Sequence, residues 1–575
     1  MRRRTIQYLV LLAVFGLSIH LYFNQSFSLP SNPDWSLDDY WPDKERGQAA
    51  HEDVVRPPTR PPPSPPPKAP NSLPADVEKR DAVVAAFKYA WSAYERDAMG
   101  ADEYHPISHH GSNLGGGGGI GYTVVDALDT MLLMGLDEEY QRARTWVEEK
   151  LTFDRQGYYS MFETTIRVLG GLLSAYHLTH DDLYKHHAAD LGDRLLSAFD
   201  PDSGLPAASV NLASKTATSV GGGVSISEAT TLQLEFRYLA EITGRVAFWR
   251  KAERVMQVVN KARLPNGLAP INMNGDGTFA RSTIRLGSNG DSYYEYLLKQ
   301  YIQTNRTEPV YLQMYADAMD GVHEHLVLKT PTKELTYIAE LLPLGTTDWK
   351  SSWAPQPKQE HLACFLAGSL MLGATTSHLL DPSKPASVPP RLQEELNADG
   401  RRDWETGKAF LEGCVDTLKT ETGLSPEGVT FRTLETKAKE GERDWYIKGA
   451  GKSSNPPYDA RYMLRPEIAE SIFLAYRLTG DAKYRGHAWD LFSAIEKHCK
   501  LPEGGYATVL DVDKVPVKHL DKQETFFLSE TLKYLFLTFA DEDVLDLSRV
   551  VFNTEAHPLP IFTPTDIKPV FTKYS

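Results

Sequence analysis

Carboxylates and one histidine recur ahead of apolar segments that end in similar turns. Each stands roughly 12–16 residues before its turn, which would place it at the N-terminal end of a helix about 20 Å long. These residues are Glu163, Glu228, Asp291, His361, Glu467 and Glu524. Two carboxylates that face one pocket are the minimal apparatus for glycoside hydrolysis, because one can donate a proton while the other activates water or attacks carbon. The pattern therefore indicates a hydrolytic site for an uncharged, polyhydroxylated substrate.

The same pattern has a simpler explanation. Acids are favoured in the first turn of any helix by its dipole, and an ordinary α-solenoid also contains helical hairpins with short polar turns. Neighbouring arginines favour the catalytic interpretation, because Arg167 or Arg465 could hold one carboxylate ionised while crowded acids raise the pKa of another. The aromatic residues Phe526, Phe527 and Tyr293 are candidates to stack on a sugar, although such residues are more often part of the core.

The elements that must position these residues are seven predicted helix–turn–helix units. Each unit has an apolar first helix, and most have an aromatic residue early in the second helix. The turns begin at Met134, Leu178, Ile242, Ile302, Gly373, Leu478 and Leu537. Repeats of this kind bury their apolar faces against their neighbours. Closed into a ring, they would form an all-α toroid that gathers the acids at one mouth.

Composition narrows the class of partner. The chain has 575 residues, 41% hydrophobic and 10% aromatic, which suits a large packed core built from repeats as one unit. The formal net charge of −15 argues against a nucleic-acid surface, which would need clustered lysine and arginine. A neutral or cationic substrate, or a bound cation, is the expectation instead.

The N-terminal segment has the pattern of a signal anchor. Three arginines precede an apolar run over residues 8–23, so residues 1–7 would be a cytosolic tail and the following chain would be lumenal. A cleaved signal peptide begins in the same way, but this run ends without a small-x-small cleavage site. Residues 24–75 are predicted to form a proline-rich stem, and residues 76–575 the globular domain. We expect a single-pass type II membrane protein.

Cysteine and glycosylation signals agree with a lumenal compartment. The three cysteines are Cys364, Cys414 and Cys499, so at most one intramolecular bridge forms and one thiol is left over. They lack the spacing of metal ligands, which disfavours a zinc-dependent helical-toroid transferase. Asn305 begins an Asn-Arg-Thr sequon on a predicted helix–helix turn, where a glycan would be exposed.

Two further motifs are assigned to loops. Residues 115–119 are consecutive glycines, but the run lacks the Gly-Lys-Ser/Thr ending of a phosphate-binding loop. His109 and His110 are adjacent, so their side chains point in different directions and lack a third metal-binding partner.

At several blocks the chain resembles the class I α-1,2-mannosidases, glycoside hydrolase family 47. The blocks include Phe162-Glu-Thr-Thr-Ile-Arg, Gly290-Asp-Ser-Tyr-Tyr-Glu-Tyr, Leu464-Arg-Pro-Glu and Phe552-Asn-Thr-Glu-Ala-His-Pro, and they span nearly the whole predicted lumenal domain. The resemblance implies an (αα)7 barrel. It also implies calcium-dependent, inverting removal of terminal α-1,2-linked mannose from high-mannose N-glycans on glycoproteins.

The resemblance also implies roles for single residues. Glu163 is similar to the general acid, Glu467 to the general base and Asp291 to the third essential carboxylate; which of them donates the proton, directly or through water, is left open. Thr554 resembles the residue that binds Ca2+ through its hydroxyl and its carbonyl. The residues similar to the sugar-binding wall are Arg167, His361, Arg465, Phe526, Glu530 and Glu555. Cys364 and Cys414 match the disulfide of the family, which would leave Cys499 free.

One position departs from the family pattern. The residue two before Asp291 influences branch preference in the family and is arginine in endoplasmic-reticulum enzymes and leucine in Golgi enzymes, whereas here it is Asn289. Both the endoplasmic reticulum and the Golgi membrane therefore stay open, and we expect a monomer in either. The alternative function is a mannose-binding quality-control factor of the same fold that does not trim glycans.

Overall fold

Helix hairpins form the body of the protein. The computed structural model describes residues 73–564, except 201, 220–222, 263, 265, 346–351, 453 and 454. In each hairpin an inner helix packs against an outer helix. The inner helices are α4 (Leu128–Met134), α7 (Gly170–Thr179), α10 (Gln233–Thr243), α12 (Asp291–Gln303), α14 (Phe365–Thr376), α17 (Glu467–Thr479) and α19 (Leu532–Phe539). Their outer partners, in the same order, are α5 (Asp137–Lys150), α8 (Asp182–Leu195), α11 (Val246–Ala262), α13 (Pro309–His325), α16 (Ala398–Asp416), α18 (Ala482–His498) and α2 (Val77–Ala98).

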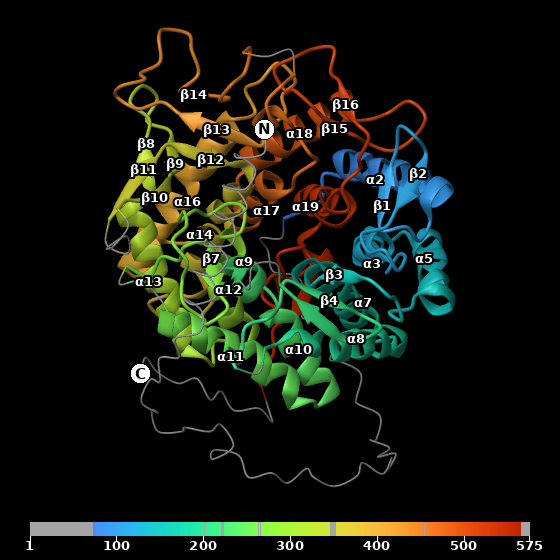
Figure 1. Cartoon of the computed structure of the whole chain (residues 1–575). Helices are drawn as coiled ribbons and strands as arrows, with labels where there is room; N and C mark the ends of the chain where they lie inside the picture. The colour runs from blue at the N-terminus through green and yellow to red at the C-terminus, as the bar shows by residue number, and fades with distance from the viewer. Residues whose placement is uncertain are drawn as a thin grey trace, which may run out of the picture. The chain divides into compact units, whose positions relative to one another are not determined.

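The inner helices close into a ring (Figure 1). Each packs against the next along the chain, from α4 through α19, and η8 (Phe527–Thr531), which leads into α19, packs against α4. The outer partner of α19 is α2, the first helix of the described chain, so residues from both ends of the domain complete the last hairpin. The predicted all-α (αα)7 barrel is confirmed.

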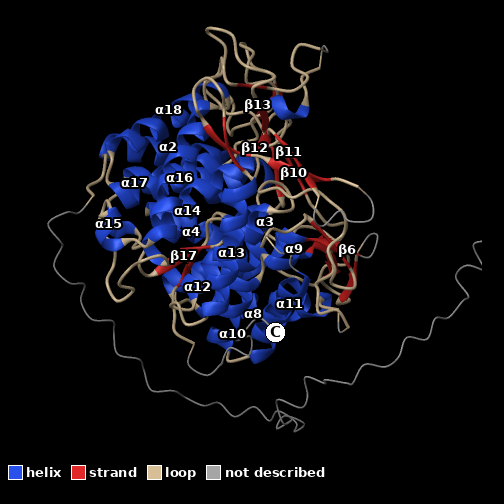
Figure 2. Ribbon diagram, turned by 90° about the vertical axis from the view of Figure 1, so that its left-hand side faces the viewer, coloured by secondary structure: helices blue, strands red, loops and turns tan. Residues whose placement is uncertain are grey.

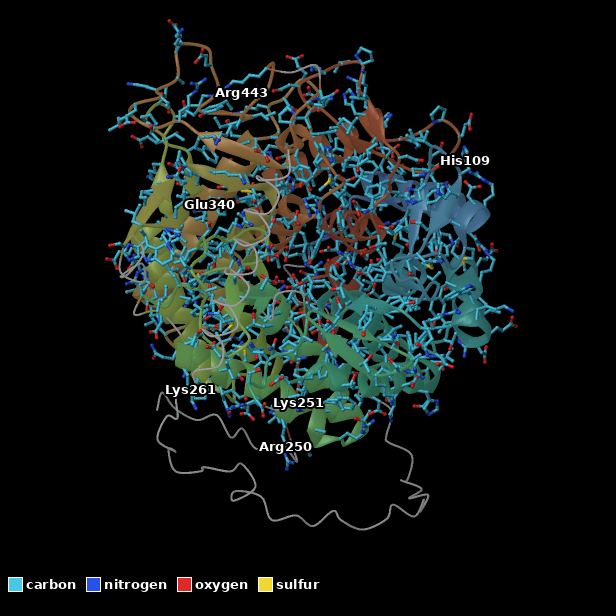
Figure 3. The ribbon with its side chains drawn as sticks, in the orientation of Figure 1. His109, Arg250, Lys251, Lys261, Glu340 and Arg443 are labelled. Carbon is cyan, nitrogen blue, oxygen red and sulfur yellow. A yellow bond between two sulfur atoms is a disulfide. The ribbon has the colours of Figure 1, made fainter. Side chains whose placement is uncertain are left out.

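Hydrophobic patterning separates the two layers. Ten of the twelve residues of α14 are buried, as expected for an inner helix that touches neighbours on every side. The outer helix α11 instead has one apolar face with Val255, Met256 and Val259 buried, while Arg250 and Lys261 are exposed. Figure 3 shows these two basic side chains at the periphery. The spacing of apolar residues in α11 therefore determines which of its faces meets the core.

The recurring turn between inner and outer helices has a capping explanation. Helix α17 ends at Thr479, and Gly480 follows with a left-handed φ of 68°. Asp481 then caps α18 by accepting a hydrogen bond from the Lys483 backbone N–H at 2.9 Å. A Thr-Gly-Asp sequence thus ends one helix and begins the next.

Short antiparallel strands connect the hairpins, and the sequence analysis did not predict them. Figure 2 shows β6 and β10 to β13 along one side of the helices. The strands are β1 (Glu103–His105), β2 (His110–Ser112), β3 (Tyr158–Ser160), β4 (Ser209–Asn211), β5 (Thr216–Thr218), β6 (Gly223–Ser225), β7 (Asn272–Asn274), β8 (Val327–Lys329), β9 (Thr336–Ile338), β10 (Glu340–Pro343), β11 (Trp353–Gln356), β12 (Lys358–Glu360), β13 (Gly428–Phe431), β14 (Trp445–Tyr446), β15 (Thr508–Val509), β16 (His519–Leu520), β17 (Val550–Phe552) and β18 (Pro558–Pro560). They form two- and three-stranded sheets.

The β17–β18 hairpin lies among the inner helices. It packs against α7, α10 and α12, and the Phe552 ring contacts Phe473 of α17 and Tyr534 of α19. Phe552 pairs with Pro558 across the hairpin, so the connecting turn contains residues 553–557. The last strands of the described chain thus enter the barrel and carry Thr554 to its axis.

Short helical segments lie between the main helices, and several of them precede an inner helix. Two of them, η2 (Thr164–Leu169) and η8, are π-helical, a widened turn that is frequent at functional sites. The others are α3 (Tyr122–Asp126), α6 (Met161–Glu163), η3 (Leu196–Ala198), α9 (Ile226–Thr230), η6 (His361–Cys364), α15 (Leu392–Glu395), η7 (Tyr458–Ala460) and η9 (Glu542–Val544).

The disulfide implied by the family resemblance is present. Cys364 and Cys414 are bonded, with 6.0 Å between their Cα atoms, and join η6 to α16. Cys499 is a free, buried cysteine. Asn305 lies on an exposed turn after α12, so the position of the predicted sequon is accessible.

The predicted tail, signal anchor and nearly all of the stem, residues 1–72, lie outside the described residues. Within residues 73–564, no helix is both long and apolar enough to cross a membrane. The first described helix begins at Val77, with Asp76 as its N-cap, close to the predicted start of the globular domain.

Candidate active site

A cavity of about 300 Å³ opens among the N-terminal ends of the inner helices. Four of the predicted acids line it: Glu163, Glu228, Asp291 and Glu467. The other two positions of the predicted series do not. Glu524 instead pairs with Lys522 at 3.3 Å, and His361 contacts the Glu467 carboxylate at 3.5 Å. The ring thus brings together carboxylates that are up to about three hundred residues apart in the chain.

Glu163 and Arg167 form one side of the cavity. The Ser160 hydroxyl caps the helix by accepting the Glu163 backbone N–H at 3.2 Å, and Arg167 lies one turn further along. Arg167 Nε donates to Glu163 Oε2 at 2.9 Å, and its Nη1 donates to Glu555 and, at 2.9 Å, to Thr525. One guanidinium therefore holds both the proposed acid, Glu163, and the deeper carboxylate of Glu555.

Asp291 begins α12 and is held from two sides. The Ser227 hydroxyl donates to its Oδ1 at 2.9 Å, and the Ser292 backbone N–H donates to the same atom at 2.8 Å. Burial, with smaller contributions from Glu295 and Glu360, raises the pKa of Asp291 to about 6. This carboxyl can therefore hold or release a proton near neutral pH.

Glu467 begins α17 and is almost fully buried. Burial raises the pKa of Glu467 to about 7, against the opposing charge of Arg465. His361 Nε2 lies 3.5 Å from Glu467 Oε2, and burial lowers the pKa of His361 to about 3, so this ring is neutral. Within the described residues, Glu467 Oε2 accepts no hydrogen bond, which leaves this oxygen available to take a proton.

Phe526 completes the wall beside two arginines. Its ring lines the cavity, with the guanidinium carbons of Arg167 and Arg465 each 5.6 Å from the ring centroid. Phe527 and Tyr293 are buried core residues and do not line the cavity. Of the predicted stacking residues, only Phe526 is therefore placed to meet a sugar.

Two deeper carboxylates were not predicted. Glu295 lies one turn after Asp291, and Glu470 lies one turn after Glu467; both line the cavity, and both contact Lys299. Helical spacing of three or four residues from a predicted acid was the signal that could have found them.

The carboxyl groups of Glu470, Glu530 and Glu555 are crowded together in the buried part of the cavity, which we call its floor. Burial and neighbouring carboxyls raise the pKa of Glu470 to about 8. Burial and Glu555 raise the pKa of Glu530, and burial together with Asp126 raises that of Glu555. These shifts indicate a site that favours added positive charge.

The Thr554 hydroxyl is a hard oxygen ligand at the cavity. This hydroxyl donates to Glu295 Oε2 at 2.8 Å and the residue lines the cavity. Among the described residues, no three histidine, cysteine or acidic side chains are grouped as metal ligands would be. A hydroxyl among carboxyl groups suits a cation that binds oxygen and keeps several waters, as calcium does.

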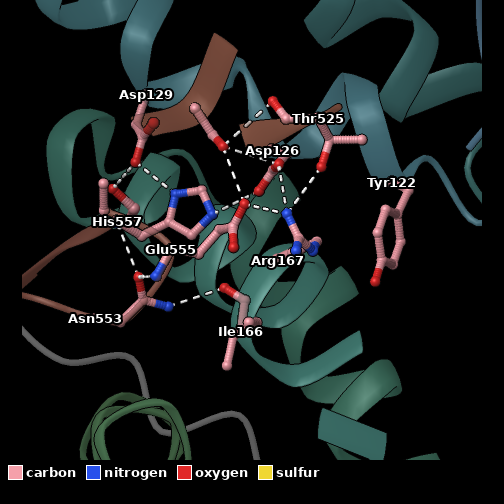
Figure 4. Close-up of polar contacts among 12 residues, drawn as sticks. Tyr122, Asp126, Asp129, Ile166, Arg167, Thr525, Asn553, Glu555 and His557 are labelled. Carbon is pink, nitrogen blue, oxygen red and sulfur yellow. Dashed lines mark hydrogen bonds and ion pairs between the residues drawn. The ribbon is translucent and has the colours of Figure 1, made fainter. Parts of the chain in front are cut away.

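A buried ionic network fixes the turn that carries Thr554 (Figure 4). The His557 ring lies between Asp129, 2.7 Å from Nδ1, and Asp126, 3.1 Å from Nε2. Lys533 Nζ lies 2.8 Å from the other oxygen of Asp129. The Asn553 amide donates to the Ile166 carbonyl at 2.8 Å. The turn is thereby bonded to the helix hairpin of α4 and to the segment that carries Arg167.

The two loop motifs do not reach the cavity. His109 lies at the periphery, where its ring contacts Asp97 at 2.9 Å and Glu503 at 3.0 Å (Figure 3). In the glycine run, Gly118 accepts a hydrogen bond from the Tyr159 hydroxyl at 2.7 Å, so this loop is closely packed.

Comparisons with known proteins place the whole globular domain in one family. The profile of "Glycosyl hydrolase family 47" matches residues 86–561. A mannosyl-oligosaccharide 1,2-alpha-mannosidase of Candida albicans is 40% identical over 506 residues, covering 86% of this chain and 84% of that protein. An endoplasmic reticulum mannosyl-oligosaccharide 1,2-alpha-mannosidase of Schizosaccharomyces pombe is 36% identical over 571 residues, covering 97% and 98%. The solved alpha-1,2-mannosidase of Trichoderma reesei superposes with a TM-score of 0.72 at 27% identity, over 85% of this chain and 100% of that one.

Proposed function

The chain belongs to glycosyl hydrolase family 47, and we propose that it removes terminal α-1,2-linked mannose from high-mannose N-glycans in the secretory pathway. The observation that carries this proposal is the cavity in which Glu163, Asp291 and Glu467 meet. A pair of carboxyl groups in one pocket is what hydrolysis of a glycosidic bond requires.

Glu467 acts as the general base. It must be ionised to act, and Arg465, 3.8 Å away, favours the ionised form against the cost of burial. Its free oxygen takes a proton from water as that water attacks the anomeric carbon. The attack comes from the face opposite the leaving oxygen, so the product is β-mannose.

Glu163 supplies the proton to the leaving oxygen, directly or through water. The bond between the anomeric carbon and that oxygen breaks, and the shortened glycan leaves with the donated proton. Asp291 is a second candidate for this step, because its raised pKa, about 6, lets it carry a proton near neutral pH. The terminal mannose lies against Phe526, with Arg167, Arg465, Glu530 and Glu555 around it.

The cofactor in this proposal is calcium, held by the hydroxyl and carbonyl of Thr554. When bound, the ion would orient sugar hydroxyls and offset the negative charge of the floor. The raised pKa values of Glu470 and Glu530 support a cation at this position, because a nearby positive charge lowers the cost of ionising both.

We propose the endoplasmic reticulum membrane as the location, with the Golgi as the alternative. The support is the name of the Schizosaccharomyces pombe relative, which matches this chain over nearly its whole length. In this proposal residues 8–23 anchor the protein and the barrel is lumenal.

Digestion of a nine-mannose N-glycan by residues 73–575 tests the function. We expect stepwise loss of single hexoses from the glycan and no loss with Glu467→Gln. Mass spectrometry of the glycan at successive times measures it. An unchanged glycan mass with the wild-type domain would refute the proposal. If the glycan also remained bound, the protein would be the alternative mannose-binding factor.

A further inference from the structure

The loop that leads into α12 lies at the rim of the cavity. We define residues 284–290 as the rim loop; Ser288 and Asn289 line the cavity, and Asn289 is exposed. The terminal mannoses of a branched high-mannose glycan are alike, so an enzyme can separate the arms only by contacts beyond the terminal sugar. An exposed side chain at the rim is placed to make such contacts.

Glu360, in β12, holds the rim loop from outside the cavity. It accepts hydrogen bonds from the Ser288 backbone N–H at 2.7 Å and from the Ser288 hydroxyl at 2.9 Å, both on Oε2. Arg285 Nη1 donates to its Oε1 at 3.1 Å, and Arg285 Nε donates to the Ser288 carbonyl at 2.8 Å. The Glu360 carboxylate thus binds the backbone N–H of Ser288, and the Arg285 guanidinium binds its carbonyl.

Close packing and backbone hydrogen bonds restrict the conformation of the rim loop near Glu360. A Cβ added at Gly287 would lie 2.4 Å from Glu360 Oε2, so the loop passes directly over the carboxylate. Asn289 follows with a left-handed φ of 69°, an uncommon conformation for a residue with a side chain. Its carbonyl accepts the Ser227 N–H at 3.1 Å, and the Asp291 N–H donates to the Gly287 carbonyl at 3.0 Å. Displacement of Ser288 would therefore move Asn289 relative to the cavity.

We propose that Glu360 and Arg285 are positioning residues for branch selectivity: they hold Asn289 where it meets the part of the glycan beyond the terminal mannose. This inference rests on the proposed mannosidase function. Neither residue lines the cavity, so neither touches the reacting atoms. Their contribution is to the relative rates at which different arms are cleaved.

Glu360→Gln keeps the size of the side chain but removes the charge. It also places an amide where two Ser288 donors need an acceptor. The measurement is the ratio of the isomeric eight-mannose products formed early from the nine-mannose glycan, together with kcat/KM for α-1,2-mannobiose. We expect the isomer ratio to change on the order of ten-fold, the effect of losing one charge-assisted hydrogen bond. The disaccharide lacks the arm, so its kcat/KM should change less.

Glu340→Gln is the matched control. Glu340 is a neighbouring buried carboxylate of strand β10, 3.9 Å from Arg285 and 3.8 Å from Lys358 (Figure 3). Its replacement should leave the isomer ratio unchanged. Arg285→Lys keeps the charge but loses the bond from Nε to the Ser288 carbonyl, so it should shift the ratio in the same direction as Glu360→Gln. It also supplies the test if Glu360→Gln does not fold.

A folding defect and a selectivity defect are separable, because loss of folded protein lowers all product rates together and leaves their ratio unchanged. An unaltered ratio in folded Glu360→Gln or Arg285→Lys would overturn the inference, as would an equal shift in Glu340→Gln. Equal wild-type rates on all arms would overturn it too. Failure of the proposed function is a different result, namely no cleavage of the glycan by the wild-type protein.

Discussion

The Arg465 guanidinium lies 3.8 Å from the Glu467 carboxylate, measured from Nη1 to Oε1. The same arginine donates from Nε to Glu427 at 2.7 Å, which fixes its orientation. Burial raises the pKa of Glu467 to about 7 and Arg465 opposes that rise. The charge state of the proposed base therefore depends on an arginine two residues before it.

Replacement of this arginine should move the pH profile of the reaction. Because Glu467 must be ionised to act, kcat/KM should be lost as pH falls through its pKa, which lies above the ordinary range of glutamate. Arg465→Gln removes the group that lowers this pKa, so the acidic limb should move to higher pH. The position of the acidic limb is measured from kcat/KM for α-1,2-mannobiose as a function of pH. Arg461→Gln, which removes an arginine stacked on Tyr458, is the control; an acidic limb at the same pH in all three proteins contradicts the assignment.

Glu467→Gln should abolish turnover while glycan binding and folding persist. The amide has nearly the same shape but cannot take a proton from water, and loss of a general base costs roughly 10²–10⁴-fold in rate. Glu524→Gln is the matched control, because Glu524 holds the equivalent place in the sequence series yet pairs with Lys522 outside the cavity. Single-turnover hydrolysis and glycan binding would be compared. Near-normal hydrolysis by Glu467→Gln would remove this residue from the role.

The first-formed sugar should be β-mannose. With water between Glu163 and Glu467, an inverting reaction requires their carboxyl groups to be about 6.5–9.5 Å apart. Proton NMR of the product within the first minutes, before mutarotation, distinguishes the anomers. An α-anomer at early times would indicate a covalent intermediate and a nucleophilic carboxylate instead.

Chelation with EDTA should stop hydrolysis and lower the melting temperature. Calcium should restore both better than zinc or magnesium, because Thr554 and the surrounding carboxylates offer only oxygen ligands in a roomy site. The rise in melting temperature should grow with calcium concentration, since only the folded chain assembles the site. Thr554→Val should weaken this rise, whereas Thr479→Val, at the end of α17, should not. Full activity and an unchanged melting temperature after exhaustive chelation would exclude the calcium proposal.

His557→Gln should destabilise the barrel more at low pH than at high pH. Burial alone would lower the pKa of His557, but the carboxylates of Asp129 and Asp126 outweigh it and raise the pKa. Stabilisation by the charged ring is therefore complete below the unfolded pKa of about 6.5 and is lost as pH rises through the folded value. Loss of one partner from a buried ion pair typically costs about 3–5 kcal/mol.

Chemical denaturation at pH 5.5 and pH 9 measures that difference. His498→Gln is the control, because burial lowers the pKa of His498 and the sign of its pH dependence is opposite. An equal loss of stability at both pH values in His557→Gln would show that the ring acts through packing and not through its charge.

The sequence by itself determined the seven hairpins and the end of the barrel at which the acids lie. Apolar periodicity marks the inner helices, and turns such as Thr479-Gly480-Asp481 end one helix and cap the next through local hydrogen bonds. These signals depend on residues within a few positions of each other. Helix position then placed Glu163, Asp291 and Glu467 at one mouth once the ring closes.

Which of those side chains share the cavity was decided only by the tertiary structure. Glu524 follows the same spacing as Glu467 but pairs with Lys522, and His361 contacts Glu467 without lining the cavity. The β17–β18 hairpin brings Thr554 to helices more than 250 residues earlier in the chain, as the bond to Glu295 shows. The raised pKa values arise from burial and from like charges gathered by the ring. Both are properties of distances across the fold, which local sequence patterns do not encode.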